Sequence, residues 1–140
     1  CYRKPHALEA CIRDTEGGIS YLVQNQGIRR IALVGHSFSG AVSISVASQS
    51  QEVLAVVALA SQTYGAEGVA SISPRSLLLV HGTADQRLSP YCSEQIYSWA
   101  RQPKELYFME GASHGLMESK DDIHDLLYGW LAEKLKSRED

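Results

Sequence analysis

Four apolar runs of strand length alternate with helix-length segments along this chain. They cover residues 28–34, 53–59, 77–80 and 105–109. Each run is mostly apolar, which is typical of a strand buried on both faces of a sheet. Because the segments between the runs have helical patterns, the order predicts an α/β fold: a parallel sheet of about four strands with helices on both faces.

The first two helical segments differ in character. In residues 5–24 apolar side chains recur every three or four positions, as an amphipathic helix requires. Gly17 and Gly18 interrupt this pattern, and each costs about 1 kcal/mol relative to Ala inside a helix, so two short helices are an alternative to one. Residues 39–49 are rich in Ala, Ser and Gly, which allows a helix to pack closely on a sheet.

The third helical segment covers residues 89–101. Ser89 is expected to cap it and Pro90 to take the first helical position. Ile96 and Trp99 are expected to face the sheet.

The last helix, residues 121–135, has the clearest pattern, with one apolar stripe, acidic residues at its start and lysines near its end. Asp121 and Asp122 are therefore expected in its first turn, and His124 on its solvated face, rather than in a catalytic site. His6 is expected on the surface near the start of the first helix.

Composition places the chain among ordinary globular domains. It has 140 residues, of which 44% are hydrophobic and 21% charged, and residues 1–140 are read as one domain. A net charge of −3 with interspersed signs gives no basic patch for nucleic acid or an anionic membrane. Because no apolar run could span a bilayer and no signal peptide is evident, a cytoplasmic protein is the simplest expectation.

Cysteines and metal ligands carry no clear chemistry. Cys1, Cys11 and Cys92 are odd in number and widely spaced, so they are expected to be reduced thiols. No cluster of His, Cys, Asp and Glu has metal-site spacing, and no metal or other cofactor is predicted. Since the first residue is Cys1 rather than Met, we expect the chain to be processed or to be part of something longer.

The most informative motif is Gly35-His-Ser37-Phe-Ser39-Gly40, which joins the first apolar run to a small-residue helix. A serine at so tight a turn holds its hydroxyl above the sheet edge, and the next backbone N–H points to where an oxyanion forms. Ser37 is thus the candidate nucleophile and the amide of Phe38 the candidate oxyanion donor. An ordinary glycine-rich turn is the alternative interpretation.

The first and last glycine positions of this motif differ in how closely they follow the usual pattern. Gly35 is needed because a side chain there would collide with the turn. The usual pattern is G-x-S-x-G, whereas Ser39 takes the last position here and Gly40 follows it. Serine is small enough for the turn to survive, with slight crowding or an extra hydroxyl near the site. Because Ser39 would already be helical, it is a poor candidate for the nucleophile.

A serine hydroxyl needs a histidine base, and the base needs a carboxylate to hold its tautomer. Asp85 follows the third apolar run and His114 follows the fourth. Taken singly, each could be a turn or surface residue. In parallel sheets the carboxyl ends of the strands form the ligand crevice, so both are expected at the same edge as Ser37. The chain order Ser, Asp, His supports the assignment.

Further polar residues flank these three. His36 precedes the candidate nucleophile and His81 opens the segment that carries the candidate acid. Together with Ser39, they are expected to line the site, and neither histidine is placed as the base.

Taken together, the segments GHSFSG, HGTAD and GASHG resemble the α/β-hydrolase superfamily over nearly the whole chain. The compact spacing of residues 61–75, without an inserted cap, is most similar to the dienelactone-hydrolase-like and small-esterase branch. Dienelactone hydrolases carry a cysteine nucleophile, so Ser37 points to ester or acyl hydrolysis in general. The resemblance implies a cofactor-free serine hydrolase that cleaves a small ester or thioester through an acyl-serine intermediate.

The resemblance also implies strands that precede the opening helix in the family. One of their loops normally supplies a second oxyanion donor, whose loss typically costs about 10² to 10³ in turnover. We therefore expect these residues to form the C-terminal part of the fold. Alone they are expected to be weakly active or inactive unless another segment or chain completes the sheet, and their exposed strand edge suggests a homodimer. The alternative function is a non-catalytic relic that serves as a binding or interaction module. Peptidase, thioesterase and lactonase activities all stay open.

Overall fold

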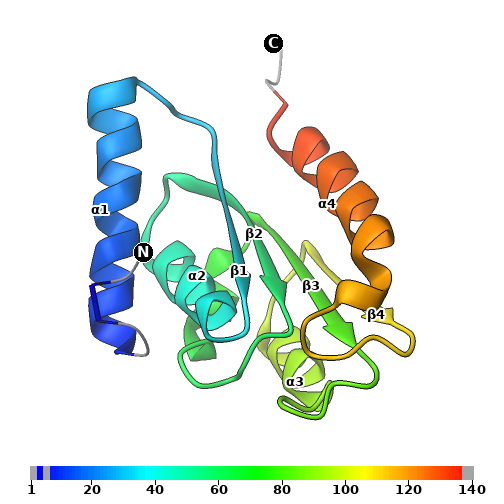
Figure 1. Cartoon of the computed structure of the whole chain (residues 1–140). Coiled ribbons are helices and arrows are strands. Elements are labelled where there is room, and N and C mark those ends of the chain that lie inside the picture. Colours follow the sequence, from blue (N-terminus) through cyan, green and yellow to red (C-terminus); the bar gives the residue numbers. More distant parts are fainter. Residues whose placement is uncertain (1–2, 5–6, 137–140) are drawn as a thin grey trace.

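A computed structural model describes residues 3–4 and 7–136 of the chain. The described part is a four-stranded parallel sheet in the order β1-β2-β3-β4, flanked by helices (Figure 1). This confirms the predicted α/β class. The strands are β1 (Ile31–His36), β2 (Val53–Leu59), β3 (Ser76–Gly82) and β4 (Lys104–Met109). The helices are α1 (Leu8–Gln26), α2 (Phe38–Gln49), α3 (Tyr91–Trp99), α4 (Lys120–Lys134) and two short 3-10 helices, η1 (Glu67–Ile72) and η2 (Met117–Ser119).

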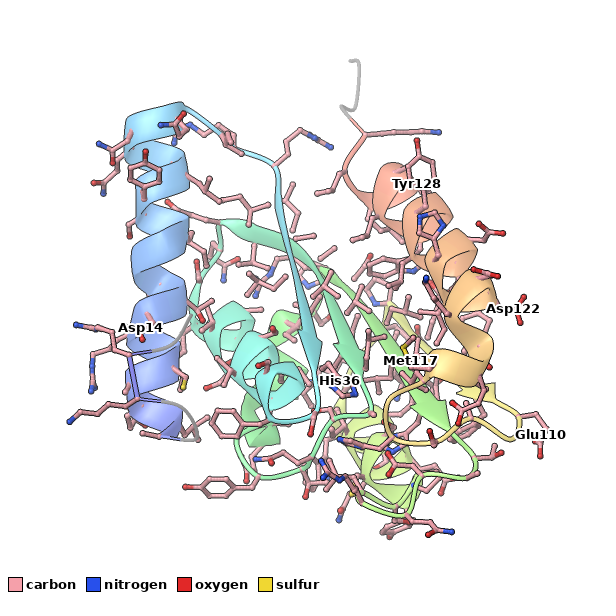
Figure 2. The ribbon with its side chains drawn as sticks, in the orientation of Figure 1. Asp14, His36, Glu110, Met117, Asp122 and Tyr128 are labelled. Atoms are coloured by element: carbon pink, nitrogen blue, oxygen red, sulfur yellow. The ribbon has the colours of Figure 1, made fainter. Side chains whose placement is uncertain are left out.

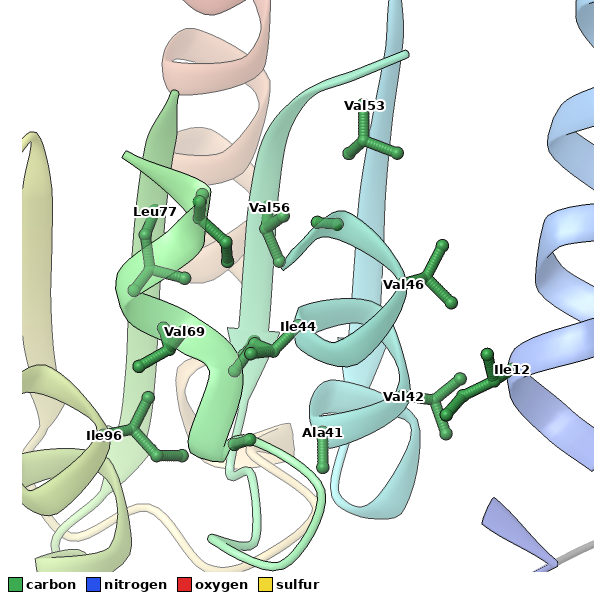
Figure 3. Packing of buried hydrophobic residues seen from close by; sticks show 14 of the residues in the cluster. Ile12, Ala41, Val42, Ile44, Val46, Val53, Val56, Val69, Leu77 and Ile96 are labelled. Carbon is green, nitrogen blue, oxygen red and sulfur yellow. The ribbon is translucent and has the colours of Figure 1, made fainter. Parts of the chain in front are cut away.

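Each face of the sheet has its own hydrophobic core, because side chains alternate along a strand. On one face, Val56 and Leu77 of the inner strands pack with Ile44 of α2 and Val69 of η1 (Figure 3). Helices α1 and α3 extend this core. On the other face, neighbouring residues of β2 and β3 pack against α4. Helices therefore cover both faces, as the alternating pattern predicts.

The prediction that all four strands are buried on both faces is wrong for the outer two. Val34 in β1 is 49% exposed and Phe108 in β4 is 41% exposed, whereas β2 and β3 are almost entirely buried. Among the described residues, β1 and β4 each pair with one strand only. An apolar run shows that a segment is a strand but not whether a neighbour covers it. The first strand also begins three residues later than expected, at Ile31.

Helix α1 is a single helix through both of its central glycines. Gly17 and Gly18 are exposed, and a Cβ at either position would meet nothing within 4 Å. The buried side chains Ile12 and Ile19 lie on the opposite stripe and hold the helix against the core. Pro5 and His6, at its predicted start, lie outside the described residues.

Helix α3 differs from the prediction at both ends. It begins at Tyr91, whose backbone N–H donates to the Ser89 hydroxyl oxygen at 3.3 Å, while Pro90 takes the capping position. Ile96 is fully buried as expected. Trp99, however, is 36% exposed and does not belong to the core, because it lies at the last residue of the helix, where the chain turns toward β4.

No helix in the described ranges combines the length and apolar character that a bilayer crossing requires. Cys11 and Cys92 are unpaired thiols, the first buried and the second partly exposed. Cys1 lies outside the described residues.

Candidate active site

Three predicted site residues meet at the carboxyl ends of the strands. The Ser37 hydroxyl follows β1, and its Oγ lies 3.0 Å from Nε2 of His114, in the loop after β4. Nδ1 of the same ring lies 2.7 Å from Oδ2 of Asp85, in the loop after β3. A carboxylate only accepts hydrogen bonds, so Nδ1 carries the proton and Nε2 accepts the hydroxyl hydrogen. The structure thus places these residues in one hydrogen-bonded chain.

Ser37 sits at a sharp corner between β1 and α2. Its φ of 57° and ψ of −121° are rare for a residue with a side chain, and such strain is concentrated at functional sites. A backbone hydrogen bond ties this turn to the end of β2, because the Ser37 N–H donates to the carbonyl of Leu59 at 2.8 Å. A Cβ at Gly35 would lie 2.1 Å from the carbonyl oxygen of Ser39. Glycine at position 35 is therefore a steric requirement of this turn.

The second glycine of the motif is required one residue later than in the usual pattern. A Cβ at Gly40 would lie 2.8 Å from the Ser61 hydroxyl oxygen, which follows β2. Ser39 lies in the first turn of α2 and is only half-buried, so the turn accommodates its side chain. Phe38 is the first residue of α2, where the helix dipole favours negative charge. Its role as oxyanion donor stays a prediction.

Asp85 is held on both carboxylate oxygens, and its side chain is 0% exposed. Oδ1 accepts the backbone N–H groups of Arg87 at 2.8 Å and Leu88 at 2.9 Å, while Oδ2 faces His114. Burial by itself raises the pKa of Asp85, but the Leu88 N–H, the His114 ring and the Arg87 N–H together hold the pKa below its usual value. The carboxylate is therefore ionised at neutral pH and can orient the imidazole.

The two flanking histidines, His36 and His81, differ in exposure and in their contacts. His36 is exposed, and its Nε2 donates to the backbone carbonyl of His114 at 2.7 Å, which ties the histidine loop to the end of β1. Sequence reasoning did not foresee this contact. His81 does not line the site, because it is fully buried beneath Asp85. Strand β3 continues to Gly82 in the middle of the sheet, so position 81 is still inside the core.

A hollow of about 220 Å³ adjoins the His114 loop. His36 and Met117 both border it and can be located in Figure 2. Its other lining residues are mostly apolar and come from β2, the histidine loop and the start of α4: Leu59, Gly115, Leu116, Lys120 and Ile123. Ser37, Asp85 and His114 are not among its lining residues, but Gly115 directly follows His114 in the chain. A larger hollow of about 730 Å³ lies at the opposite, amino ends of the strands and also includes none of the three.

The competing residues lie away from the site. Asp121 and Asp122 are exposed in the first turn of α4, as expected, and Asp122 can be located in Figure 2. The His124 side chain is 74% exposed and contacts Asp125 on the same helix. His6 lies outside the described residues.

Comparison with known proteins gives the context for this geometry. No family model matches the chain. The uncharacterized protein YfhR of Escherichia coli O157:H7 is 28% identical over 140 aligned residues, which cover 82% of this chain and 49% of YfhR. The chain therefore spans about half the length of this relative.

Solved structures match more of the chain. A dienelactone hydrolase from Anabaena variabilis superposes with a TM-score of 0.84 at 20% identity, covering 96% of this chain and 65% of that one. The esterase domain of a Rhodothermus marinus protein superposes with a TM-score of 0.74 at 21% identity, covering 85% and 67%. With the parallel sheet and the strand-end loops already described, these matches show that the chain has the fold of the α/β-hydrolase superfamily.

Proposed function

We propose that this protein is a serine hydrolase that cleaves small carboxylic esters or thioesters. The observation that carries the proposal is the chain of two hydrogen bonds, 3.0 and 2.7 Å long, that links the Ser37 hydroxyl through His114 to Asp85. A hydroxyl, an imidazole and a buried carboxylate in this order form the arrangement that activates serine as a nucleophile.

In the first half of the reaction, His114 Nε2 takes the hydroxyl proton while Ser37 Oγ bonds to the carbonyl carbon of the substrate. The imidazolium that forms is stabilised by the ionised Asp85 at 2.7 Å. Negative charge collects on the carbonyl oxygen beside the N-terminus of α2, where the Phe38 amide is the expected donor. The tetrahedral species then expels the alcohol or thiol, which receives the proton from Nε2.

The second half repeats these steps with water. His114 takes a proton from the water while the water oxygen attacks the carbonyl carbon of the acyl-serine ester. The carboxylic acid leaves, and Ser37 Oγ regains its proton from the imidazolium. No cofactor is needed in either half.

The hollow of about 220 Å³ next to the histidine loop supports a small substrate. Its volume of about 220 Å³ is below the roughly 300–1,000 Å³ that is typical of sites for drug-sized ligands. Its lining is mostly apolar, which suits a short acyl or alkyl group better than a charged one. The likeness to a dienelactone hydrolase and an esterase domain supports the same class of chemistry.

The test is covalent labelling with a fluorophosphonate probe. A single turnover is enough to label an activated serine, so the test works even where turnover is slow. We expect wild type and Ser39→Ala to be labelled and Ser37→Ala not to be labelled, with Ser39 as the matched control in the same turn. Hydrolysis of p-nitrophenyl acetate with a burst of nitrophenol would then show that an acyl-enzyme accumulates.

Failure of the folded, full-length protein to react would reject the hydrolase proposal. It would favour the alternative that the protein serves as a binding or interaction module. Equal labelling of Ser37→Ala and wild type would instead place the reactive serine elsewhere.

A further inference from the structure

One buried titratable side chain has no part in the mechanism above. His81 lies near the end of β3, an inner strand, and its side chain is 0% exposed. Its Nε2 lies 3.1 Å from Asp85 Oδ2 and 3.0 Å from the carbonyl oxygen of Leu88, and its Nδ1 lies 2.7 Å from the Ser93 hydroxyl. Asp85 Oδ2 therefore contacts two imidazoles, those of His81 and His114.

These contacts determine where the His81 ring carries its hydrogen. The Leu88 carbonyl and the Asp85 carboxylate can only accept, so Nε2 must be the donor to both. The Ser93 hydroxyl is fully buried, and within the described residues its partner is Nδ1 of His81. If Nδ1 carried a hydrogen, that hydroxyl would have no acceptor, which is costly for a buried group. The network thus calls for the tautomer with hydrogen on Nε2 alone.

We propose that His81 is a positioning residue that holds the Asp85 carboxylate in the orientation His114 requires. Its catalytic consequence rests on the proposed hydrolase function, whereas its effect on the Asp85–His114 contact does not.

The origin of each contact shows why the carboxylate needs this support. The N–H groups that hold Oδ1 belong to Arg87 and Leu88, which lie in the same loop as Asp85, so these two bonds do not tie the loop to the sheet. His81 lies on an inner strand of the sheet. Its Nε2–H bridges the carboxylate and the carbonyl of Leu88, so it fastens the loop to the sheet at two points.

Ser93 completes the support from another direction. It lies in α3, is fully buried, and fixes the rotation of the His81 ring through Nδ1. Sheet and helix together therefore set the place of Asp85 Oδ2, and through it the direction of the His114 ring. A site held by such a supporting layer keeps its reacting groups within the narrow tolerance that catalysis needs.

The first experiment compares labelling rates and ester kinetics of His81→Phe with wild type. Phenylalanine fills a similar space but donates no hydrogen bond. A displacement of reacting groups by about 1 Å can lower a rate about 10²-fold. We expect the fluorophosphonate labelling rate and the kcat for p-nitrophenyl acetate to fall by roughly that factor, with KM little changed. A rise in KM with kcat unchanged would contradict a positioning role.

Two amide substitutions at position 81 distinguish the position of the hydrogen-bond donor from the mere presence of a polar side chain. The side-chain N–H of glutamine can reach the place of Nε2, whereas that of asparagine reaches only the place of Nδ1. We expect His81→Gln to recover labelling to within about tenfold of wild type, and His81→Asn to stay as slow as His81→Phe. The pair also replaces His81→Phe if that variant does not fold. Equal rates for the two amides would overturn the proposal.

The control for general destabilisation is Ile96→Val. Ile96 is fully buried on α3, three residues after Ser93, and its apolar side chain donates no hydrogen bond to Asp85 or His81. Its substitution should loosen the same helix without removing a donor to Asp85. We expect labelling at the wild-type rate, and a loss as large as that of His81→Phe would reduce His81 to a structural role.

A second readout does not depend on catalysis. Nitrogen-15 NMR of the histidine rings should find His81 protonated at Nε2 only, and His114 Nδ1–H at low field because it is bonded to Asp85. In His81→Phe, or in His81→Asn, the His114 signal should shift, while Ile96→Val should leave it in place. An unchanged His114 signal overturns the positioning role. A shifted signal in a protein that no fluorophosphonate labels would uphold it and reject the hydrolase function instead.

Discussion

Asp85 Oδ2 and His114 Nδ1 lie 2.7 Å apart although 29 residues separate them in the chain. The contact is formed because β3 and β4 are adjacent and parallel, so their loops leave the sheet at the same edge. It orients a partly exposed imidazole through a carboxylate that has no exposed surface.

Loss of that carboxylate should nearly abolish the proposed chemistry. In Asp85→Asn the amide can present N–H toward Nδ1, which favours the wrong tautomer of His114. The corresponding change in serine proteases lowers kcat about 10⁴-fold. We expect a similar fall in fluorophosphonate labelling with the fold intact by circular dichroism. A variant that kept more than a tenth of the wild-type rate would contradict the role of Asp85.

Asp85 should also make the fold sensitive to acid. Hydrogen bonds lower its folded-state pKa despite burial, so its contribution to stability is present above the unfolded value of about 3.9 and is lost as pH falls through the folded value. The stability difference between wild type and Asp85→Asn should therefore be constant from pH 7 to 5 and shrink below about pH 4. Urea titrations at pH 6, 4 and 3 measure it, and a gap that widens with acid would contradict the sign.

Two glycine-to-alanine substitutions should have opposite effects. A Cβ at position 35 would meet the Ser39 carbonyl oxygen at 2.1 Å, so Gly35→Ala must displace backbone and should destabilise the fold and abolish labelling. Gly17→Ala adds its Cβ to open space on an exposed helix face and should stabilise by about 0.5–1 kcal/mol. Thermal and urea unfolding of both variants check this, and a neutral Gly35→Ala would show that the turn can be rebuilt.

The hollow next to the histidine loop should select the length of the acyl group. Met117 borders it and is 69% exposed, so Met117→Trp should narrow it without disturbing the core. We expect kcat/KM for p-nitrophenyl butyrate to fall about tenfold relative to the acetate, within the range of one to three kcal/mol per methylene that pockets can discriminate. Tyr128→Trp, on an exposed face of α4 outside the hollow, is the control. An unchanged acetate-to-butyrate ratio would place the acyl group elsewhere.

The sequence predicted the strands and helices well because their periodicity reflects burial directly. It could not tell inner from outer strands, since Val34 and Phe108 are as apolar as their buried counterparts and differ only in what lies next to them. It left α1 ambiguous because helix propensity penalises Gly17 and Gly18, whereas packing of the opposite stripe decides the outcome.

The site follows the same division. Ser37, Asp85 and His114 could be chosen from the sequence because each follows a strand end in a short motif. The supporting contacts could not, because they depend on register. His81 directly follows four buried residues of β3, and this was a clue that the strand continued and that the ring was inside. Its pairing with Ser93, 12 residues away on a helix, has no local pattern.

The proposed nucleophile, Ser37, and the proposed base, His114, follow the two outer strands, β1 and β4, and the proposed acid, Asp85, follows the inner strand β3. In the described part of the chain, each outer strand can detach by breaking a single ladder of hydrogen bonds, while β3 is held from both sides. Local opening of such outer strands requires less free energy than global unfolding. Warming or mild denaturant should therefore abolish fluorophosphonate labelling of Ser37 while most of the secondary structure persists. Loss of labelling would then measure local opening of the outer strands rather than global unfolding.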